Sequence, residues 1–395
     1  MQKREVWITG IGLVSCFGEG ADHHWQLFSG PAAPEPVINS DRFAPYSVHP
    51  MPQMDWSKQI ARRGDQRQME NWQRLGTYTA GMALDDAGLK DNEDMVSTMD
   101  LVVAAGGGER DIAVDDSIMR DAVSRNDREQ LLNERLPSDL RPTLFLAQLS
   151  NLMAGNISIV HKVTGSSRTY MGEESAGITA IENAMRRIEA GQSTHALVGG
   201  AFNAERPDLL LSMELGHYTW KGAPLPVAAR QSQGGGMITG SVGAFVVLEE
   251  AGHATARSAR PYARLSRMVS ELGSRDEAAI RTRLASMLER LAPTPGTPVV
   301  SGASGCGGIT DIEFDTLREK LGAAVALRAF NTMIGNPVEA NFPAGIALAA
   351  LAIHHGAFFA PFERSERSAS GAPDSVLVSS IGHHMGEGFG LVEKI

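Results

Sequence analysis

Cysteine is scarce in this chain, with two copies, Cys16 and Cys306, among 395 residues. Two cysteines are too few for a disulfide framework, so a reducing cytoplasm is the expected setting. Basic residues are outnumbered, with 36 Lys and Arg against 46 Asp and Glu. The resulting formal net charge of −10 argues against a nucleic-acid-binding surface and for solubility.

Long apolar runs are also missing. No stretch reaches the length of a membrane span, and the first residues, MQKREVWITG, lack the apolar core of a signal peptide. These absences predict a soluble cytoplasmic protein without a membrane span. The length of 395 residues exceeds the size at which one hydrophobic core stops growing, so two domains or two fused halves are expected.

The clearest local pattern lies in residues 164–205. Apolar side chains recur at helical spacing from Ile178 to Ile188, and Gly191 follows as the usual residue past a helix end. The run 196–200 is apolar and small, as is typical of a strand buried on both faces. The segment therefore predicts a short strand, a glycine turn, a helix and a second strand.

The start of that helix is a favourable place for a nucleophile or an anion, because its unpaired N–H groups point outward. Here it holds Glu173 and Glu174, followed by Ser175. The segment resembles the nucleophile region of the β-ketoacyl-ACP synthases, the condensing enzymes of fatty acid and polyketide synthesis. In that family a turn of the form T-A-C-S-S-G leads into a helix and then into a strand ending in A-G-G.

Other segments strengthen the resemblance, which covers almost the whole chain. They are similar to the family's opening strand, to a helix with an N-x-x-A-G ending and to a strand with a terminal double glutamate: residues 5–17, 145–155 and 240–250. The resemblance implies an α/β, thiolase-like fold, with two pseudo-duplicated halves in a five-layered α/β/α/β/α arrangement. The halves are expected at 1–255 and 256–395.

The resemblance also implies a cap at about 109–145, which in the family helps to form the dimer contact and the acyl channel. Residues 213–233 are predicted to form a long loop. The second half is predicted to begin with a helix at 274–291, with Ser274 as its N-cap, followed by a strand at 298–301, two helices and a final hairpin.

An active condensing enzyme needs a thiolate that carries the acyl chain and two imidazoles, or an imidazole and an amide, near it. The register places Glu174 where the family has its cysteine. We expect its carboxylate to stabilise the helix N-terminus rather than to act as a nucleophile. Ser304 falls where the first histidine should be, and a hydroxyl does not titrate near neutral pH, so a turn serine is the favoured interpretation.

The second histidine is replaced by Asn336, and the lysine that precedes it in the family is replaced by Asn331. Asn336 could donate a hydrogen bond to an oxyanion, as an amide does in the chalcone-type branch of the superfamily. With no histidine in either motif, however, it is expected to lack a partner for proton transfer. At the gate to the acyl pocket, His383 replaces the family's phenylalanine and His384 follows it; both are interpreted mainly as structural or interface residues.

Cys306 is the candidate thiol of the site region, and a small residue in a tight turn is favoured over a reactive one. The positions grouped as channel or gate are therefore His383, His384, Asn331 and Cys306. The resemblance implies no cofactor and no metal. It implies as partners an acyl carrier protein with an acyl or malonyl chain, and a second ketosynthase chain in a homodimer or heterodimer.

Three functions remain open. The favoured one is a non-condensing subunit that resembles a chain-length factor, pairs with an active synthase and shapes its chain-measuring tunnel. The second is an enzyme with a divergent site, either a 3-oxoacyl-ACP synthase or a malonyl-ACP decarboxylase. The third is a stand-alone sensor of acyl groups or acyl carriers.

Overall fold

The computed structural model describes residues 3–140 and 146–395. Ten strands build its large sheets. Those of the first half are β1 (Val6–Ser15), β4 (Asp100–Ala104), β5 (Ser167–Tyr170), β6 (His195–Phe202) and β8 (Val242–Glu250). Those of the second half are β9 (Ala263–Glu271), β10 (Val299–Ser301), β11 (Leu327–Ala329), β12 (Ser375–Ile381) and β13 (Glu387–Glu393). Three short strands lie beside them: β2 (Gly18–Glu19), β3 (Val48–His49) and β7 (Thr239–Gly240).

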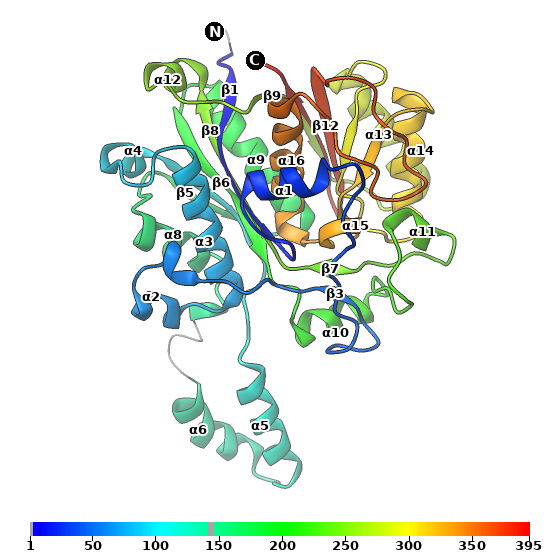
Figure 1. Ribbon diagram of the computed structural model, residues 1–395. Helices are drawn as coiled ribbons and strands as arrows, with labels where there is room; N and C mark the ends of the chain where they lie inside the picture. Colours follow the sequence, from blue (N-terminus) through cyan, green and yellow to red (C-terminus); the bar gives the residue numbers. More distant parts are fainter. Residues whose placement is uncertain (1–2, 141–145) are drawn as a thin grey trace.

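The helices lie on and between these sheets (Figure 1). In the first half they are α1 (Ala21–Phe28), α2 (Arg63–Gln68), α3 (Asn71–Asp86), α4 (Glu93–Thr98), α5 (Ile112–Val123), α6 (Arg128–Asp139), α8 (Leu152–His161), α9 (Glu174–Glu189), α10 (Pro207–Leu215), α11 (Val227–Gln231) and α12 (Ala251–Ala256). In the second half they are α13 (Glu277–Leu291), α14 (Ile309–Leu321), α15 (Asn331–Ile334) and α16 (Asn341–His355). None of these described helices is long and apolar enough to cross a membrane.

The two halves repeat one sheet topology. The first half has the strand order β5-β4-β6-β8-β1, and the second has β11-β10-β12-β13-β9. In each half the first three strands of that order are parallel and the last two pair antiparallel. The short pairing of Trp7 and Ile8 with Arg264 and Ala263 joins β1 to β9. The predicted pseudo-duplication is confirmed.

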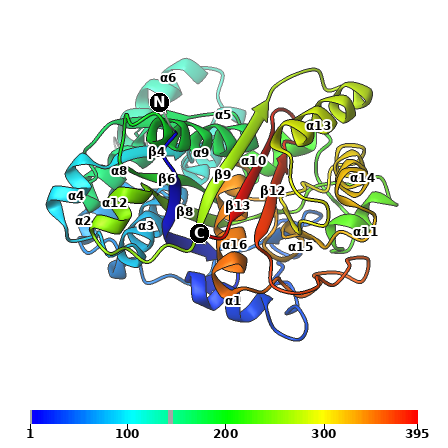
Figure 2. The ribbon, with the colours of Figure 1, turned by 90° about the horizontal axis from the view of Figure 1, so that it is seen from above.

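Helices α9 and α16 form the layer between the sheets, and Figure 2 shows them in the middle of the molecule. Each packs against strands of both halves. All residues of α16 from Asn341 to Ile353 are buried, because a helix between two sheets has no face left for solvent. Helices α3 and α8 cover the outer face of the first sheet, and α13 and α14 cover that of the second. The five-layered, thiolase-like α/β arrangement is therefore confirmed.

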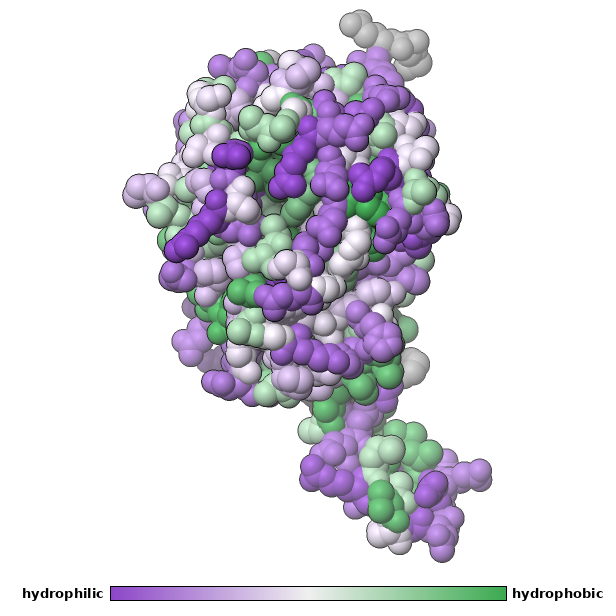
Figure 3. Space-filling model, turned by 90° about the vertical axis from the view of Figure 1, so that its right-hand side faces the viewer, coloured by the Kyte–Doolittle hydropathy of each residue, from purple (hydrophilic) through white to green (hydrophobic). Residues whose placement is uncertain are grey.

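Helices α5 and α6 form an arm that projects from the body (Figure 1). They pack on each other, and an ion pair between Arg135 and Asp121 ties them together. The arm occupies most of the predicted cap at 109–145, whose residues 141–145 lie outside the described part of the chain. Apolar side chains on the arm remain exposed, including Met119 at 66% and Val123 at 83% exposure. Figure 3 shows hydrophobic surface on the projecting arm.

Some predicted elements differ from the structure. Residues 213–233 are not one loop, because α11 forms within them. The N-cap of α13 is Asp276, which accepts a hydrogen bond from the backbone of Ala279, and Ser274 instead accepts one from Asp276. The second half begins with strand β9, which was not predicted, although its first residues alternate between apolar and polar as a strand does. We propose residue 255, near the end of α12, as the boundary between the halves.

Gly12 in β1 lets α3 approach the first sheet closely. A Cβ atom at this position would lie 2.0 Å from the carbonyl oxygen of Thr79 and 2.9 Å from the backbone nitrogen of Ala83. Both are helix backbone atoms, which cannot move aside as a flexible side chain would. The absence of a side chain at Gly12 is therefore a packing requirement.

We expect Gly12→Ala to destabilise the fold by about 1–3 kcal/mol or more, because the added methyl group overpacks this contact. Chemical unfolding of the variant and the parent chain measures the change. Gly155→Ala is the matched control, since nothing lies within 4 Å of a Cβ atom there and the site is helical. The control is expected to be neutral or stabilising by about 1 kcal/mol. Equal stabilities of the two variants would contradict the packing role of Gly12.

Candidate functional site

A sharp turn between β5 and α9 positions the residue at the family's nucleophile position. Gly172 has a φ of 132° and Glu173 a φ of 56°. Positive φ is uncommon for a residue other than glycine, so the chain reverses tightly here. Glu174 then begins α9 with its side chain fully buried, at 0% exposure. The predicted glycine turn and helix are confirmed, and the carboxylate lies inside the protein.

Two side chains from the second half hold this carboxylate. The Nδ1 atom of His383 lies 2.9 Å from Oε1 and 3.0 Å from Oε2 of Glu174. The amide of Asn336 donates a hydrogen bond to Oε1 at 3.2 Å. Neither family motif supplies a histidine beside Asn336, but His383 from the gate position shares the same acceptor.

The three groups form a buried charge pair with an amide beside it. Burial alone would raise the pKa of Glu174, but the charge and the hydrogen bond of His383 lower this pKa below its usual value. Burial opposes a charge on His383 as well, yet the Glu174 carboxylate raises the imidazole pKa to about 9. At neutral pH the pair is therefore an imidazolium and a carboxylate, each neutralising the other.

The turn that carries His383 is held by arginines of the second half. The backbone nitrogen of Gly382 donates to the carbonyl oxygen of Gly386 at 2.8 Å, which closes the turn between β12 and β13. Arg275 donates both to the carbonyl oxygen of Gly382 and to the fully buried carboxylate of Glu387. Arg283 binds the same carboxylate at 2.8 and 2.9 Å. These contacts fix the place from which His383 reaches Glu174.

Tyr218 covers the histidine pair. Its ring lies edge-on to the ring of His383, with centroids 4.6 Å apart, and its hydroxyl lies 3.4 Å from Nδ1 of His384. The backbone oxygen of Tyr218 accepts a weak hydrogen bond from Sγ of Cys306 at 3.7 Å. Burial raises the pKa of Cys306 to about 12, so the sulfur is a thiol at neutral pH. The hydroxyl of Ser304 accepts a hydrogen bond from the Cys306 backbone at 3.2 Å.

Asn331 does not join this cluster. Its amide donates to the carbonyl oxygens of Gly302 and Ala303, at 3.1 Å each. It thereby supports the loop that carries Ser304 and Cys306 from the other side. Of the predicted site residues, the structure brings together Glu174, Asn336 and His383, keeps the loop 304–306 beside them, and places Asn331 behind that loop.

A pocket of about 340 Å³ opens beside the turn that precedes Glu174. Its wall combines apolar side chains with a glycine strand end: Trp72, Gly106, Gly107, Gly108, Met171, Phe202, Leu209 and Met213. Glu339 and His384 also line it. Burial, followed by repulsion from Glu174 and Glu173, raises the pKa of Glu339 to about 7. The pocket is thus mostly apolar, and the Glu339 carboxyl group in its lining changes its charge near neutral pH.

Glu173, Glu174 and His383 are the described residues that could hold a metal ion together, with ligand atoms within 4.8 Å of one another. A metal ligand set would need a nitrogen of His383 to be unprotonated. Here the Nδ1 atom of His383 is hydrogen-bonded to Glu174, and the raised pKa keeps the ring protonated. The distance of 2.9 Å between Nδ1 of His383 and Oε1 of Glu174 is that of a hydrogen bond from the ring to the carboxylate.

Three residues of the site were not singled out from the sequence. Glu173 adds a second carboxylate, 3.6 Å from Nε2 of His383, and its position before Glu174 was a visible signal. Glu339 follows Asn336 by three residues, and a charged residue in this apolar segment was a signal as well. Tyr218 lies in a segment that was predicted to be a loop, and nothing in its local sequence marks its contact with His383.

Comparison with known proteins decides the family. The family model described as "Beta-ketoacyl synthase, N-terminal domain" matches residues 3–254. The chain belongs to the β-ketoacyl synthase family. A 3-oxoacyl-[acyl-carrier-protein] synthase 2 of Rhizobium meliloti is 29% identical over 286 residues, which cover 66% of this chain and 62% of that protein. Similar synthases of Vibrio harveyi and Vibrio cholerae are likewise matched over 62% of their length.

Two relatives are matched over more of the chain. The tetracenomycin polyketide synthase ketoacyl synthase beta subunit of Streptomyces glaucescens is 26% identical over 369 residues, covering 88% of this chain and 85% of that protein. Among solved structures, the ishigamide ketosynthase/chain length factor matches with a TM-score of 0.80 at 18% identity, over 100% of both chains. A β-ketoacyl synthase from Burkholderia phymatum has a TM-score of 0.79 at 17% identity, over 99% and 100% of the two chains. These structures share the fold of this β-ketoacyl synthase family member.

The Glu174–His383 pair predicts how stability depends on pH. In the folded protein the pKa of His383 is about 9, above its ordinary value of 6.5. The contribution of His383 to the free energy of unfolding is therefore complete below pH 6.5 and is lost as the pH rises through about 9. The lowered pKa of Glu174 acts in the opposite sense, because its contribution is present above the ordinary value of 4.5 and is lost in acid. We expect the pair to stabilise most between about pH 4.5 and 6.5, with a loss of roughly 3 kcal/mol by about pH 9.5.

Urea unfolding at a series of pH values, followed by tryptophan fluorescence, measures this dependence. His383→Gln should remove the decline between pH 6.5 and 9.5, whereas His384→Gln, on the neighbouring residue, should keep it. A decline of the same size in His383→Gln and in the parent chain would show that other groups cause it.

Proposed function

We propose that the chain is a non-condensing subunit that resembles a chain-length factor and pairs with an active ketosynthase in type II fatty acid or polyketide synthesis. The observation that carries this proposal is the set of contacts at Glu174, the residue that the resemblance aligns with the family's nucleophile. A buried carboxylate stands there, and both donors beside it, His383 and Asn336, hydrogen-bond to it. A condensing enzyme would use such donors to stabilise an oxyanion of its substrate.

The sulfur chemistry supports the same proposal. Acyl transfer to a cysteine requires a thiolate, and burial keeps Cys306 protonated, with a pKa of about 12. Glu174 is a poor replacement as an acyl acceptor, because an acyl anhydride is hydrolytically labile. The scaffold around the site is nevertheless complete, as a subunit with a structural role in the synthase requires.

We propose two partners for this chain, a carrier protein and a second synthase chain. The carrier is an acyl carrier protein with an acyl or malonyl chain. In support, a solved complex described as a type II PKS acyl-carrier protein with its ketosynthase bound to the hexaketide matches this chain with a TM-score of 0.73 at 16% identity. The second partner is an active ketosynthase, and the pocket of about 340 Å³ beside Glu174 is the proposed contribution to the tunnel that measures the growing chain.

An assay of the purified chain with acyl-ACP and malonyl-ACP, alone and mixed with a candidate active synthase, tests the proposal. Alone, the chain should release no carbon dioxide and form no 3-oxoacyl product. In the mixture, product should form and its length distribution should differ from that of the partner alone. Glu174→Gln should leave product formation in the mixture intact, because the partner's cysteine carries the acyl group.

Two results would overturn the subunit proposal. One is condensation or decarboxylation by the chain alone that Cys306→Ala or Glu174→Ala abolishes, since this is the behaviour of a divergent enzyme. The other is a stable homodimer that does not exchange with any candidate synthase and does not change its products, which is the behaviour of a stand-alone sensor.

The arm formed by α5 and α6 is the proposed contact with the partner. Met119 and Val123 are exposed by 66% and 83%, and such apolar side chains are typical of the centre of an interface. We expect Met119→Asp with Val123→Asp to weaken the complex at least roughly tenfold, as measured by sedimentation or titration calorimetry.

Ile395→Asp is the matched control for the arm variants. Ile395 is also an exposed apolar residue, at 53%, and it lies at the C-terminus, on the opposite side of the molecule from the arm (Figure 1). It should leave the affinity unchanged. Equal affinities of the arm variant and the parent chain would exclude the arm from the interface.

A further inference from the structure

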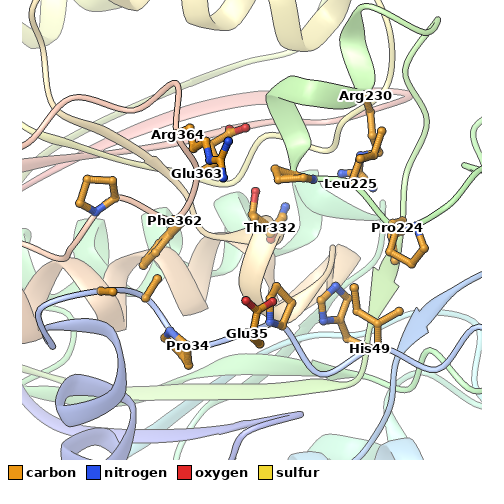
Figure 4. A pocket seen from close by; sticks show the side chains of 18 of the residues that line it. Pro34, Glu35, His49, Pro224, Leu225, Arg230, Thr332, Phe362, Glu363 and Arg364 are labelled. Carbon is orange, nitrogen blue, oxygen red and sulfur yellow. The ribbon is translucent and has the colours of Figure 1, made fainter.

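A second and larger pocket, of about 860 Å³, is shown from close by in Figure 4. Three segments distant in sequence form its walls: residues 31–40, residues 224–230 and residues 361–364. Much of the lining is rigid and apolar, and it includes Pro31, Pro34, Pro36, Pro224, Leu225, Pro226, Ile238, Pro361 and Phe362. This volume and this apolar character are those of pockets that bind small molecules.

Arg230 is a buried cation in the lining of this pocket, and two of its nitrogens have no hydrogen-bond partner among the described residues. Arg230, in α11, is 1% exposed, and its Nε and Nη1 atoms are buried without a hydrogen-bond acceptor among the described residues. Figure 4 shows its side chain reaching from α11 toward the interior of the pocket. Burial lowers the pKa of Arg230 to about 10, so the guanidinium still carries its charge at neutral pH.

An unpaired buried cation is costly, because it loses its hydration and gains no counter-charge. Among the described residues, a second fully buried arginine shows how such a charge is usually compensated. Arg328, at 0% exposure, donates to the carbonyl oxygens of Phe359, Leu327 and Arg367 and lies 3.6 Å from the carboxylate of Glu366. Arg230 has no such contacts at Nε and Nη1, so these two donors are unpaired.

Glu363 attracts Arg230 from nearby, but no hydrogen bond or ion pair joins the two side chains among the described residues. The carboxylate of Glu363 accepts a hydrogen bond from the backbone of Ala228 at 3.3 Å, and burial raises its pKa. Glu35 is exposed, and the side chain of Arg364 adds a second positive charge to the lining. His49, the remaining titratable group there, is kept neutral by burial and by the charge of Arg230, with a pKa of about 3.

A buried acceptor complements the buried donors. Oδ1 of Asn331, another residue of the lining, has no hydrogen-bond partner among the described residues. The planar guanidinium of arginine matches the geometry of carboxylate and phosphate groups. We propose that this pocket binds a small organic anion, a carboxylate or a phosphate monoester with an apolar body, through Arg230, while Asn331 accepts a hydrogen bond from a hydroxyl or amide of the same ligand.

This inference goes beyond the proposed function and does not rest on it. Its position is nevertheless informative, because Gln231, next to Arg230, donates to the carbonyl oxygen of Gly305 at 2.8 Å. The amide of Asn331 holds Gly302 and Ala303 of the same loop. A ligand at Arg230 would therefore lie next to residues that hold the loop carrying Ser304 and Cys306.

Titration calorimetry of the full chain with hexanoate, hexyl phosphate, inorganic phosphate and hexanol tests the proposal. Saturable binding of hexanoate with weaker binding of hexyl phosphate assigns a carboxylate site, and the reverse order assigns a phosphate site. Arg230→Met should weaken the better probe by about tenfold to a hundredfold, as expected for the loss of charge-assisted hydrogen bonds. Arg281→Met, at an exposed arginine that changes the net charge equally, should bind as the parent chain does.

Thermal unfolding separates a ligand role from a structural role. Without ligand, Arg230→Met should have an unchanged or higher melting temperature, because it removes an uncompensated buried charge, whereas Arg328→Met should have a lower one. If Arg230→Met does not fold, Arg230→Lys, which keeps the charge and loses the planar fork, must still weaken the probe. Absence of binding by any anion, binding of hexanol as tight as hexanoate, or full affinity of Arg230→Lys and Arg230→Met would overturn the proposal.

Discussion

The site depends on one electrostatic constraint: a carboxylate that is fully removed from water must meet a positive charge. Glu174 lies at the N-terminus of α9, where the helix dipole favours a negative charge. That interaction is too weak to compensate for complete burial. The imidazolium of His383, at 2.9 Å, provides the remaining compensation. The turn 382–386 is therefore tied to the start of the central helix.

The same constraint accounts for the other replacements around the site. A neutral amide at Asn336 can satisfy the second lone pair of Glu174 without adding another titrating group. Neutral Ser304 and the protonated thiol of Cys306 leave the local charge unchanged. In this chain the anion is permanent, and the imidazolium is bound to it.

Much of the fold could be predicted from the sequence, because the decisive patterns are local. The helix from Glu174 to Glu189, the glycines at its two ends and the buried strand β6 follow from periodicity and turn residues alone. Strand β9 was not predicted, although the alternation of apolar and polar residues at its start is a strand pattern. The alternation is interrupted near Arg267, where the pairing with β13 shifts register, and that irregularity depends on the partner strand.

The site was less accessible to sequence reasoning. The register identified Glu174, Asn336 and His383 as individual replacements. The contact between Glu174 and His383 joins residues that are 209 positions apart, and it depends on how the turn after β12 lies over α9. The lack of a hydrogen-bond acceptor at Nε and Nη1 of Arg230 cannot be predicted from the sequence either, because it depends on which groups the fold places around the guanidinium.

The central layer has a consequence for how the molecule unfolds. Helix α9 belongs to the first half and α16 to the second, yet each packs against strands of both sheets. Unfolding of either half would expose the apolar surface that the other half had covered. We therefore expect the two halves to lose their structure in a single cooperative transition, so that the sequence duplication does not create two independent folding units. The arm of α5 and α6, which packs mainly on itself, is the part free to open separately.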